Sequence, residues 1–225
     1  ERLCTEQPDS GPGLWNRVDY RPLEGFVYAI SPFNFTAIGG NLATAPALLG
    51  NTVVWKPATA AGLAAWHIMQ ILQQAGLPPG VINFVPGEAV AVSRQVLADP
   101  RLAGVHFTGS TSVFQSLWRE VGSRIDRYRT YPRLVGETGG KNFVLAHPSA
   151  DLDALAVALL RGAYEYQGQK CSAASRAYIP ASLWPALCER LVAMIADLRM
   201  GDLRDLRNFM AAVIDRRAFH RIQSC

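Results

Sequence analysis

The sequence predicts an α/β fold with a mostly parallel sheet in a Rossmann-like layout. Short β-rich runs alternate with stretches of helical spacing from residue 25 onward. Hydrophobic residues make up 49% of the 225 positions and charged residues only 18%, a composition that supports a sizeable buried core. Glycine and proline stand where the runs end and the chain turns. A sheet of this kind binds ligands at the carboxyl ends of its strands.

Each element follows from a local pattern. Buried strands are predicted at 25–30, 52–56, 81–85, 104–107 and 134–136. Helices are predicted at 60–75, 89–98 and 111–125. After Gly139-Gly140 the alternation restarts with a strand at 142–145, a helix at 152–166, a strand at 176–179 and a helix at 183–198. This restart predicts a second domain from about Lys141. Residues 1–22 are rich in Pro and Gly and are expected to form a loop and part of an exposed hairpin.

Composition excludes several classes of protein. No apolar run approaches the roughly 18 residues that a membrane helix needs, so no membrane partner is expected. The net charge of +4 comes from scattered Arg residues, which favour a solvated face or subunit contact over a nucleic-acid site. Four cysteines without a CxxC pair favour a reducing compartment over a disulfide framework. The four His residues lie far apart in the sequence, so no metal site is expected.

Cys171 is the candidate nucleophile. It lies in the loop Gly168-Gln169-Lys170-Cys171-Ser172, between a predicted helix and a predicted strand. An exposed thiol beside a lysine can have a lowered pKa and attack a carbonyl carbon. From these residues alone, a buried inert cysteine remains the alternative. Cys188 lies on an apolar helix and is interpreted as a core residue.

Two further side chains follow predicted strands. Glu137 precedes Thr138-Gly139-Gly140 and can act as a general base, with a helix cap or a surface ion pair as alternatives. Asn34 is flanked by Phe33 and Phe35 and can donate a hydrogen bond to a developing oxyanion, although such residues also simply form turns.

Two strand ends are suited to a nucleotide. Gly109 and Ser110 join a predicted strand to the start of a helix, where backbone N–H groups and the helix dipole favour a phosphate. Lys56 ends another strand, from which its ammonium can reach a ribose or a phosphate.

Taken together, these segments resemble one family. SPFNF, WKP, AGLPPGVINFVPG, FTGS, ETGGK and GQKCS occur in this order between Ser31 and Ser172 and are similar to the motifs of the aldehyde dehydrogenase superfamily. Finer features, including Phe33, Phe114, GETGGKN and YEYQGQKCSAAS, resemble its 1-pyrroline-5-carboxylate dehydrogenase branch. That branch oxidises L-glutamate γ-semialdehyde to glutamate in proline catabolism.

The resemblance implies a role for each residue. Cys171 would add to the aldehyde, Asn34 and the Cys171 backbone N–H would hold the oxyanion, and Glu137 would activate water. Phe35 and Ser172 would contact the substrate. The residues implied for the cofactor NAD are Ser31, Phe33, Lys56, Gly87, Gly109, Ser110, Thr111, Ser112 and Val113. Thr59 stands where NAD-preferring relatives often carry an acidic residue, so NADP stays open as the alternative.

The resemblance also implies an organisation in three parts. Residues 1–22 would hold a loop and part of an oligomerisation hairpin, 23–140 part of an NAD-binding domain, and 141–225 the N-terminal part of a catalytic domain in the aldehyde dehydrogenase fold. Relatives continue beyond the position of Cys225, so we expect an incomplete chain. The alternative functions are another aldehyde dehydrogenase specificity, or a non-catalytic truncated fragment that only binds nucleotide or pairs with a full-length subunit. A homo-oligomer is expected for the parent protein, in the cytoplasm of a bacterium or the mitochondrial matrix of a eukaryote.

Overall fold

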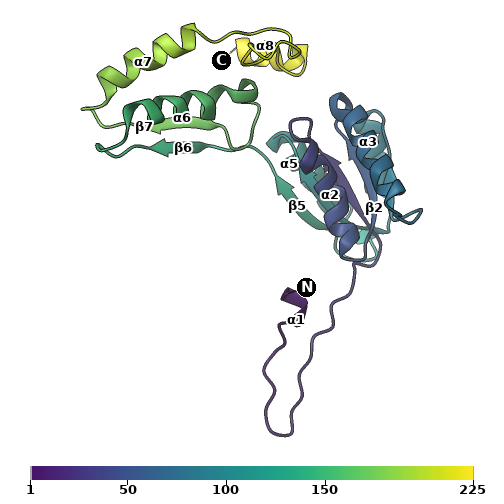
Figure 1. The fold of residues 1–225 in the computed structure, drawn as a ribbon. Coiled ribbons are helices and arrows are strands. Elements are labelled where there is room, and N and C mark those ends of the chain that lie inside the picture. Colours follow the sequence, from purple (N-terminus) through teal and green to yellow (C-terminus); the bar gives the residue numbers. More distant parts are fainter. Residues whose placement is uncertain (1, 225) are drawn as a thin grey trace. The chain divides into compact units, whose positions relative to one another are not determined.

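The computed structural model describes residues 2–224, which divide into two compact units (Figure 1). The first unit ends at Glu137 and the second begins at Thr138. Each unit combines parallel strands with helices, as the α/β prediction requires.

The first unit contains a five-stranded parallel sheet. Its strands are β1 (Phe26–Ser31), β2 (Thr52–Pro57), β3 (Ile82–Phe84), β4 (Leu102–Thr108) and β5 (Arg133–Glu137). They lie in the order β3-β2-β1-β4-β5, and every neighbouring pair is parallel. The chain therefore builds one half of the sheet outward from β1, crosses back and builds the other half. This is the Rossmann-like layout predicted from the alternation of elements.

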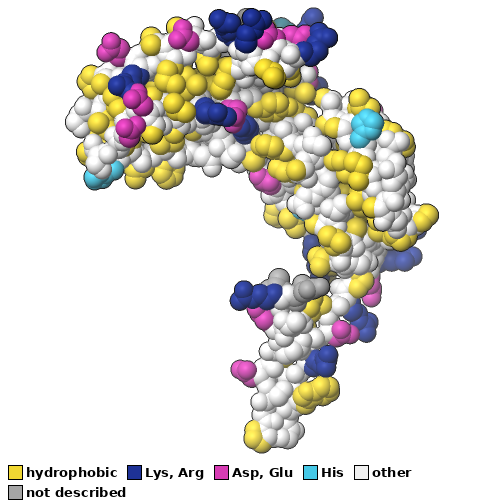
Figure 2. All heavy atoms as spheres, in the orientation of Figure 1, with side chains coloured by type: hydrophobic (Ala, Val, Ile, Leu, Met, Phe, Trp, Pro, Cys, Tyr) yellow, Lys and Arg dark blue, Asp and Glu magenta, His cyan; other side chains and the backbone are white. Residues whose placement is uncertain are grey.

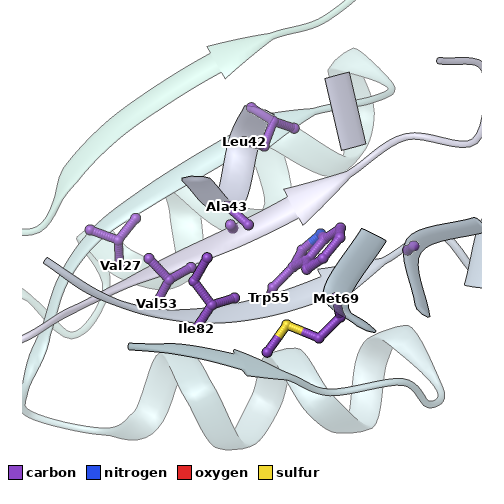
Figure 3. Packing of buried hydrophobic residues seen from close by; sticks show 9 residues of the cluster. Val27, Leu42, Ala43, Val53, Trp55, Met69 and Ile82 are labelled. Atoms are coloured by element: carbon purple, nitrogen blue, oxygen red, sulfur yellow. The ribbon is translucent and has the colours of Figure 1, made fainter. Parts of the chain in front are cut away.

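Helices cover both faces of this sheet. They are α2 (Thr36–Leu48), α3 (Gly62–Gln74), α4 (Ala89–Ala98) and α5 (Thr111–Gly122), with short 3-10 turns η1 (Thr59–Ala61) and η2 (Ile125–Arg127). Alternate strand residues point to opposite faces. One core therefore joins residues such as Val53 and Trp55 to Leu42 and Met69 of α2 and α3 (Figure 3). The other core, on the opposite face of the sheet, joins residues of β1 and β4 to α4 and α5. Its buried members are Tyr28, Leu97, Leu102, Val105, Phe107, Leu117 and Val121.

Helix α2 was not predicted from the sequence. It contains Gly39, Gly40 and Pro46, which normally lower helix stability, and its apolar residues do not form a clear stripe. A Cβ at Gly40 would lie 3.4 Å from the Ile68 side chain of α3, and Leu42 and Ala43 of α2 are buried in the core that α2 and α3 form with the sheet. Burial of this helix thus takes precedence over helix propensity here.

The N-terminal segment forms a short helix and an extended hairpin. Helix α1 (Arg2–Thr5) precedes a turn in which Gly11 and Leu14 exchange backbone hydrogen bonds of 3.1 and 2.9 Å. Side chains tie the two arms together, since the Gln7 Oε1 accepts from the Val18 N–H at 2.9 Å. Hydrophobic side chains lie on the surface of this segment (Figure 2).

The second unit is smaller. It contains the parallel strands β6 (Asn142–Leu145) and β7 (Ala174–Tyr178) and the helices α6 (Leu152–Tyr164), α7 (Trp184–Ala196) and α8 (Arg216–Gln223), with a 3-10 turn η3 (Glu165–Gly168). Leu155, Leu159 and Leu187 form its core between α6 and α7. The charged helix α8 was not predicted, and the predicted helices at 111–125, 152–166 and 183–198 end earlier in the structure. No described helix is long and apolar enough to cross a membrane.

Candidate functional site

The candidate site residues of the first unit lie at one edge of its sheet. Because all five strands are parallel, their carboxyl ends meet at the same edge. Each strand end is marked by one residue: Ser31, Thr108 and Glu137 are the last residues of β1, β4 and β5, and Lys56 is the last but one of β2. Gly87 follows β3. The sheet register therefore brings five segments, spread over more than 100 positions, to one edge of the first unit.

The end of β1 leads directly into helix α2. Ser31 is buried, and its Oγ accepts a 3.0 Å hydrogen bond from the Trp55 indole of the neighbouring strand. Phe33, Asn34 and Phe35 follow in half-buried positions before the helix begins at Thr36. The segment that carries Asn34 is therefore a short loop held between a buried strand end and a helix.

Lys56 is buried at the end of β2, with only 3% of its surface exposed. Its Nζ donates a 2.8 Å hydrogen bond to the Pro57 carbonyl. Burial lowers the pKa of this amine, and the nearby Glu88 carboxylate acts in the opposite direction. The ammonium is thus held at the sheet edge beside a negative charge.

Glu88 is a site residue that sequence analysis did not identify. It caps helix α4, and its carboxylate accepts hydrogen bonds from the backbone N–H groups of Val90 (2.9 Å) and Ala91 (2.6 Å). These two hydrogen bonds hold the pKa of Glu88 below its usual value, and Lys56 adds to the effect. The signal was the acidic residue immediately before the predicted helix, which is typical of an N-cap.

The start of helix α5 presents exposed polar groups. Ser110 caps the helix through a 3.4 Å hydrogen bond from the Val113 N–H to its Oγ, and Ser110 to Val113 are all exposed. Gly109 fits closely, since a Cβ there would lie 2.6 Å from the Phe107 ring. The backbone N–H groups of the first turn face a surface where a phosphate can approach.

A cavity of about 460 Å³ lies between helices α4 and α5. It is lined by Ala89, Val90, Ser93, Arg94, Leu97, Val113, Ser116, Leu117, Glu120 and Arg124. Its mixture of aliphatic walls and a few polar groups suits a flat, partly polar ring. Of these residues, sequence analysis named only Val113 for the cofactor, because the cavity exists only once the two helices pack side by side.

Glu137 is the last residue of β5 and is exposed. Its carbonyl accepts a 3.1 Å hydrogen bond from the Gly109 N–H, which ties the base candidate to the turn before α5. Within residues 2–224 its carboxylate makes no salt bridge and caps no helix. Neither structural alternative, a helix cap or a surface ion pair, is present among the described residues.

Cys171 lies in the second unit, in a half-buried position just after η3. The turn before it is left-handed, with φ of 55° at Tyr166, 56° at Gln167 and 64° at Gly168. The Glu165 carboxylate stabilises the turn by binding Lys170 Nζ at 2.6 Å and Arg161 at 2.5 Å. These partners, Lys170 first, lower the pKa of Glu165.

The remaining candidates of the second unit are placed as follows. Ser172 is exposed immediately after the thiol. Cys188 is half-buried on α7, where its neighbour Leu187 is the fully buried residue. The described part of the chain contains no cluster of His, Cys, Asp and Glu suited to a metal ion.

Comparison with known proteins identifies relatives along the whole chain. The model of the aldehyde dehydrogenase family matches residues 2–225. The mitochondrial delta-1-pyrroline-5-carboxylate dehydrogenase of Emericella nidulans is 55% identical over 99% of this chain and 39% of its own length. The mouse enzyme of the same name is 53% identical over 97% of this chain and 39% of its own length.

A solved structure agrees with the fold. The delta-pyrroline-5-carboxylate dehydrogenase of Mycobacterium tuberculosis, bound with NAD, is 62% identical and superposes with a TM-score of 0.93. The match covers 98% of this chain and 41% of that protein. The chain thus spans about two fifths of the length of the relatives it matches. It belongs to the aldehyde dehydrogenase family.

Proposed function

We propose that this chain carries the nucleophile, the base and the nucleotide-binding sheet of an NAD-dependent dehydrogenase that oxidises L-glutamate γ-semialdehyde to glutamate. The observation that supports this most strongly is the 62% identity to a delta-pyrroline-5-carboxylate dehydrogenase bound with NAD, over 98% of the chain. The set of strand-end residues in the first unit and the thiol loop in the second provides the groups that such a reaction needs.

Cys171 begins the chemistry. Its thiolate adds to the aldehyde carbon, and the Asn34 amide and the Cys171 N–H donate hydrogen bonds to the oxygen that becomes negative. Loss of one such donor typically costs about 2.7 to 4 kcal/mol of barrier. When bound, NAD would supply the hydride acceptor for this carbon, and Cys171 would then hold the acyl group as a thioester. Phe35 and Ser172 contact the substrate in this proposal.

Glu137 completes the reaction. Its carboxylate removes a proton from water, the resulting hydroxide adds to the thioester carbon, and the C–S bond breaks. Glutamate leaves with its new carboxylate, and Cys171 returns as the thiolate. The exposed position of Glu137 and its lack of a salt bridge among the described residues support this role, because a base must be accessible to water.

Features of the first unit fit NAD. The exposed first turn of α5 suits the pyrophosphate, with Gly109 to Val113 supplying N–H and hydroxyl groups. The cavity between α4 and α5 suits the adenine, and Lys56 suits the ribose. Ser31, Phe33 and Gly87 complete the proposed cofactor residues. Thr59 is exposed and not acidic, but Glu88 brings a carboxylate to Lys56 and opposes a 2′-phosphate, which favours NAD over NADP.

The experiment that tests this function compares two cysteine variants of the protein. Cys171→Ala is expected to abolish turnover of glutamate semialdehyde with NAD and to remove the site labelled by iodoacetamide. Cys188→Ala is the matched control on helix α7, and it is expected to lower thermal stability while retaining turnover. Equal activity of wild type and Cys171→Ala would refute the mechanism, and a preference for a simple aliphatic aldehyde would refute the substrate.

We also propose a homo-oligomer in which residues 1–22 contact a second copy. The hairpin exposes apolar side chains, with Trp15 78% and Leu14 60% exposed, in a segment held by its own hydrogen bonds. Exposed apolar patches of this kind are typical of subunit contacts. Light scattering of the protein tests this, and a monomer at micromolar concentration would contradict it.

The division of labour between the units and the location of the protein are proposals as well. We propose that residues 23–140 bind the nucleotide and residues 141–225 carry the nucleophile. Several eukaryotic relatives are named mitochondrial, which supports a mitochondrial location if the source is a eukaryote. For a bacterial source we propose the cytoplasm. Cell fractionation with a matrix marker tests the former.

A further inference from the structure

Both peptide groups that flank the Cys171 α-carbon are hydrogen-bonded within the second unit. The Lys170 carbonyl, on the N-terminal side, accepts from the Ala173 N–H at 3.2 Å. The Cys171 carbonyl, on the C-terminal side, accepts from the Asn142 side-chain amide at 2.6 Å. The peptide planes on either side of the α-carbon are therefore held, and with them the direction of the Cys171 Cα–Cβ bond and of the backbone N–H.

The backbone of the ETGGK segment reinforces this arrangement. Gly140 packs directly against the Cys171 carbonyl, and a Cβ there would overlap the carbonyl oxygen. Asn142 follows two residues later as the first residue of β6. The segment with Gly139 and Gly140 thus packs directly against the loop at 168–173, which we call the thiol loop.

An irregularity in the strand pairing places Asn142 in reach of the loop. Asn142 pairs with Ala174, but the next residue, Phe143, pairs with Arg176, so β7 carries one extra residue at this point. Such bulges redirect side chains near functional sites. Asn142 is exposed, so its hydrogen bond is not the satisfaction of a buried polar group and needs another explanation.

We propose that Asn142 is a positioning residue for the nucleophile, which acts by holding the Cys171 carbonyl through its side-chain amide. This proposal rests on the assignment of Cys171 as the nucleophile. Only a donor serves at this position, because an aspartate would place a negative charge against the carbonyl oxygen. With the carbonyl held, the thiol and the Cys171 N–H keep the alignment that addition to an aldehyde and stabilisation of its oxyanion require.

The test uses three variants of the protein. Asn142→Leu removes the donor at similar size, and Asn142→Gln restores an amide on a longer side chain. Asn208→Leu is the matched control, because Asn208 also donates from its side chain to a backbone carbonyl, that of Asp202 at 2.9 Å, in the same unit. Thermal unfolding, kcat, KM and amide hydrogen exchange of residues 168–173 are measured for each.

We expect Asn142→Leu to lower kcat about tenfold with KM changed less than about twofold, as loss of one alignment contact predicts. Asn142→Gln should recover part of kcat. The melting temperature of Asn142→Leu should fall no further than that of Asn208→Leu. An unchanged kcat in Asn142→Leu, or a loss of kcat that follows the unfolded fraction, would overturn the proposal.

Hydrogen exchange separates this proposal from the proposed function. Exchange in residues 168–173 needs no substrate, and it should accelerate about tenfold in Asn142→Leu and stay unchanged in Asn208→Leu. If the wild-type protein does not oxidise glutamate semialdehyde, the proposed function fails while this measurement still reports on the loop. Unchanged exchange in Asn142→Leu would show that Asn142 does not hold the loop, whatever the substrate.

Discussion

The sheet edge of the first unit and the thiol loop of the second hold their residues in position in different ways. At the sheet edge, five parallel strands with buried residues such as Tyr28, Trp55 and Val105 fix where each functional segment starts. The thiol loop stands beside only two strands and is held by individual ties, from Glu165 to Lys170 and from Asn142 to Cys171. A large core thus positions the strand-end residues, whereas a few hydrogen bonds and one glycine contact position the Cys171 loop.

The largest expected effect on activity comes from disrupting the contact between Gly140 and the thiol loop. Gly140→Ala adds a methyl group that overlaps the Cys171 carbonyl, so the loop must shift. A shift of about 1 Å typically costs roughly a hundredfold in rate. We expect kcat to fall by about this factor, measured with glutamate semialdehyde and NAD.

Gly62→Ala is the control for this change. Gly62 begins helix α3, and a Cβ there would meet no atom within 4 Å, so activity should stay within about twofold. If both alanine variants retained full activity, the thiol loop would be more adaptable than the comparison of the two regions implies.

A smaller effect is expected at the sheet edge, where Glu88→Gln removes a charge and keeps an oxygen to cap α4. The pKa of Glu88 is held low, so the carboxylate is charged at neutral pH and opposes a 2′-phosphate. We expect affinity for NADP to rise about fivefold, which corresponds to roughly 1 kcal/mol for a solvated charge pair, with NAD changed less than about twofold. Calorimetric titration with both nucleotides measures this.

Asp151→Asn provides the matched control, since Asp151 caps helix α6 of the second unit in the same way through the Ala154 N–H. It should weaken the helix without changing the ratio of NADP to NAD affinity. An unchanged ratio in Glu88→Gln would assign cofactor preference to another residue.

The smallest effect concerns an acid–arginine pair that occurs in both units. Arg101 holds the pKa of Asp99 at about 2, below the usual value of 3.8, through hydrogen bonds from its side chain and backbone. A lowered acid pKa stabilises the fold above pH 3.8, and this contribution is lost as the pH falls through about 2. Asp99→Asn should therefore reduce the pH dependence of unfolding in this window by less than about 1 kcal/mol, because the pair is exposed.

Asp202→Asn tests the equivalent pair in the second unit, where Arg204 likewise lowers the pKa of Asp202. Urea unfolding followed at several pH values compares the two variants. A larger effect at Asp202 than at Asp99 would show that the second unit depends on its surface ion pairs more than the first.

Periodic elements could be predicted from the sequence, and features that depend on contacts between distant residues could not. Strands such as β1 and β2 follow from their apolar runs, and their ends identified Lys56 and Glu137 as site candidates. Helix α2 escaped prediction because its stability comes from burial against the sheet and α3, which its own sequence does not record. The cavity between α4 and α5 arises from the packing of two helices, a tertiary contact that no local pattern records.

The thiol loop illustrates the same limit within the second unit. The GQKC motif pointed to Cys171, but the hydrogen bond from Asn142 joins residues 29 positions apart. It depends on a bulge in the pairing of β6 and β7, which propensity does not predict. The motif therefore predicted Cys171 as the candidate nucleophile, whereas its hydrogen bond with Asn142 could be seen only in the structure.

In the left-handed turn before Cys171, substitution by glycine should affect stability differently from elsewhere in the chain. Glycine in place of a larger residue normally destabilises a protein by about 0.5 to 1 kcal/mol. At Tyr166 and Gln167, with φ of 55° and 56°, glycine relieves about as much backbone strain as it adds in chain entropy, so it should be nearly neutral. Gly168 is the opposite case, because a Cβ there would lie 2.8 Å from the Ala163 carbonyl oxygen. A deep mutational scan should thus show two glycine-tolerant positions followed by one that accepts glycine alone.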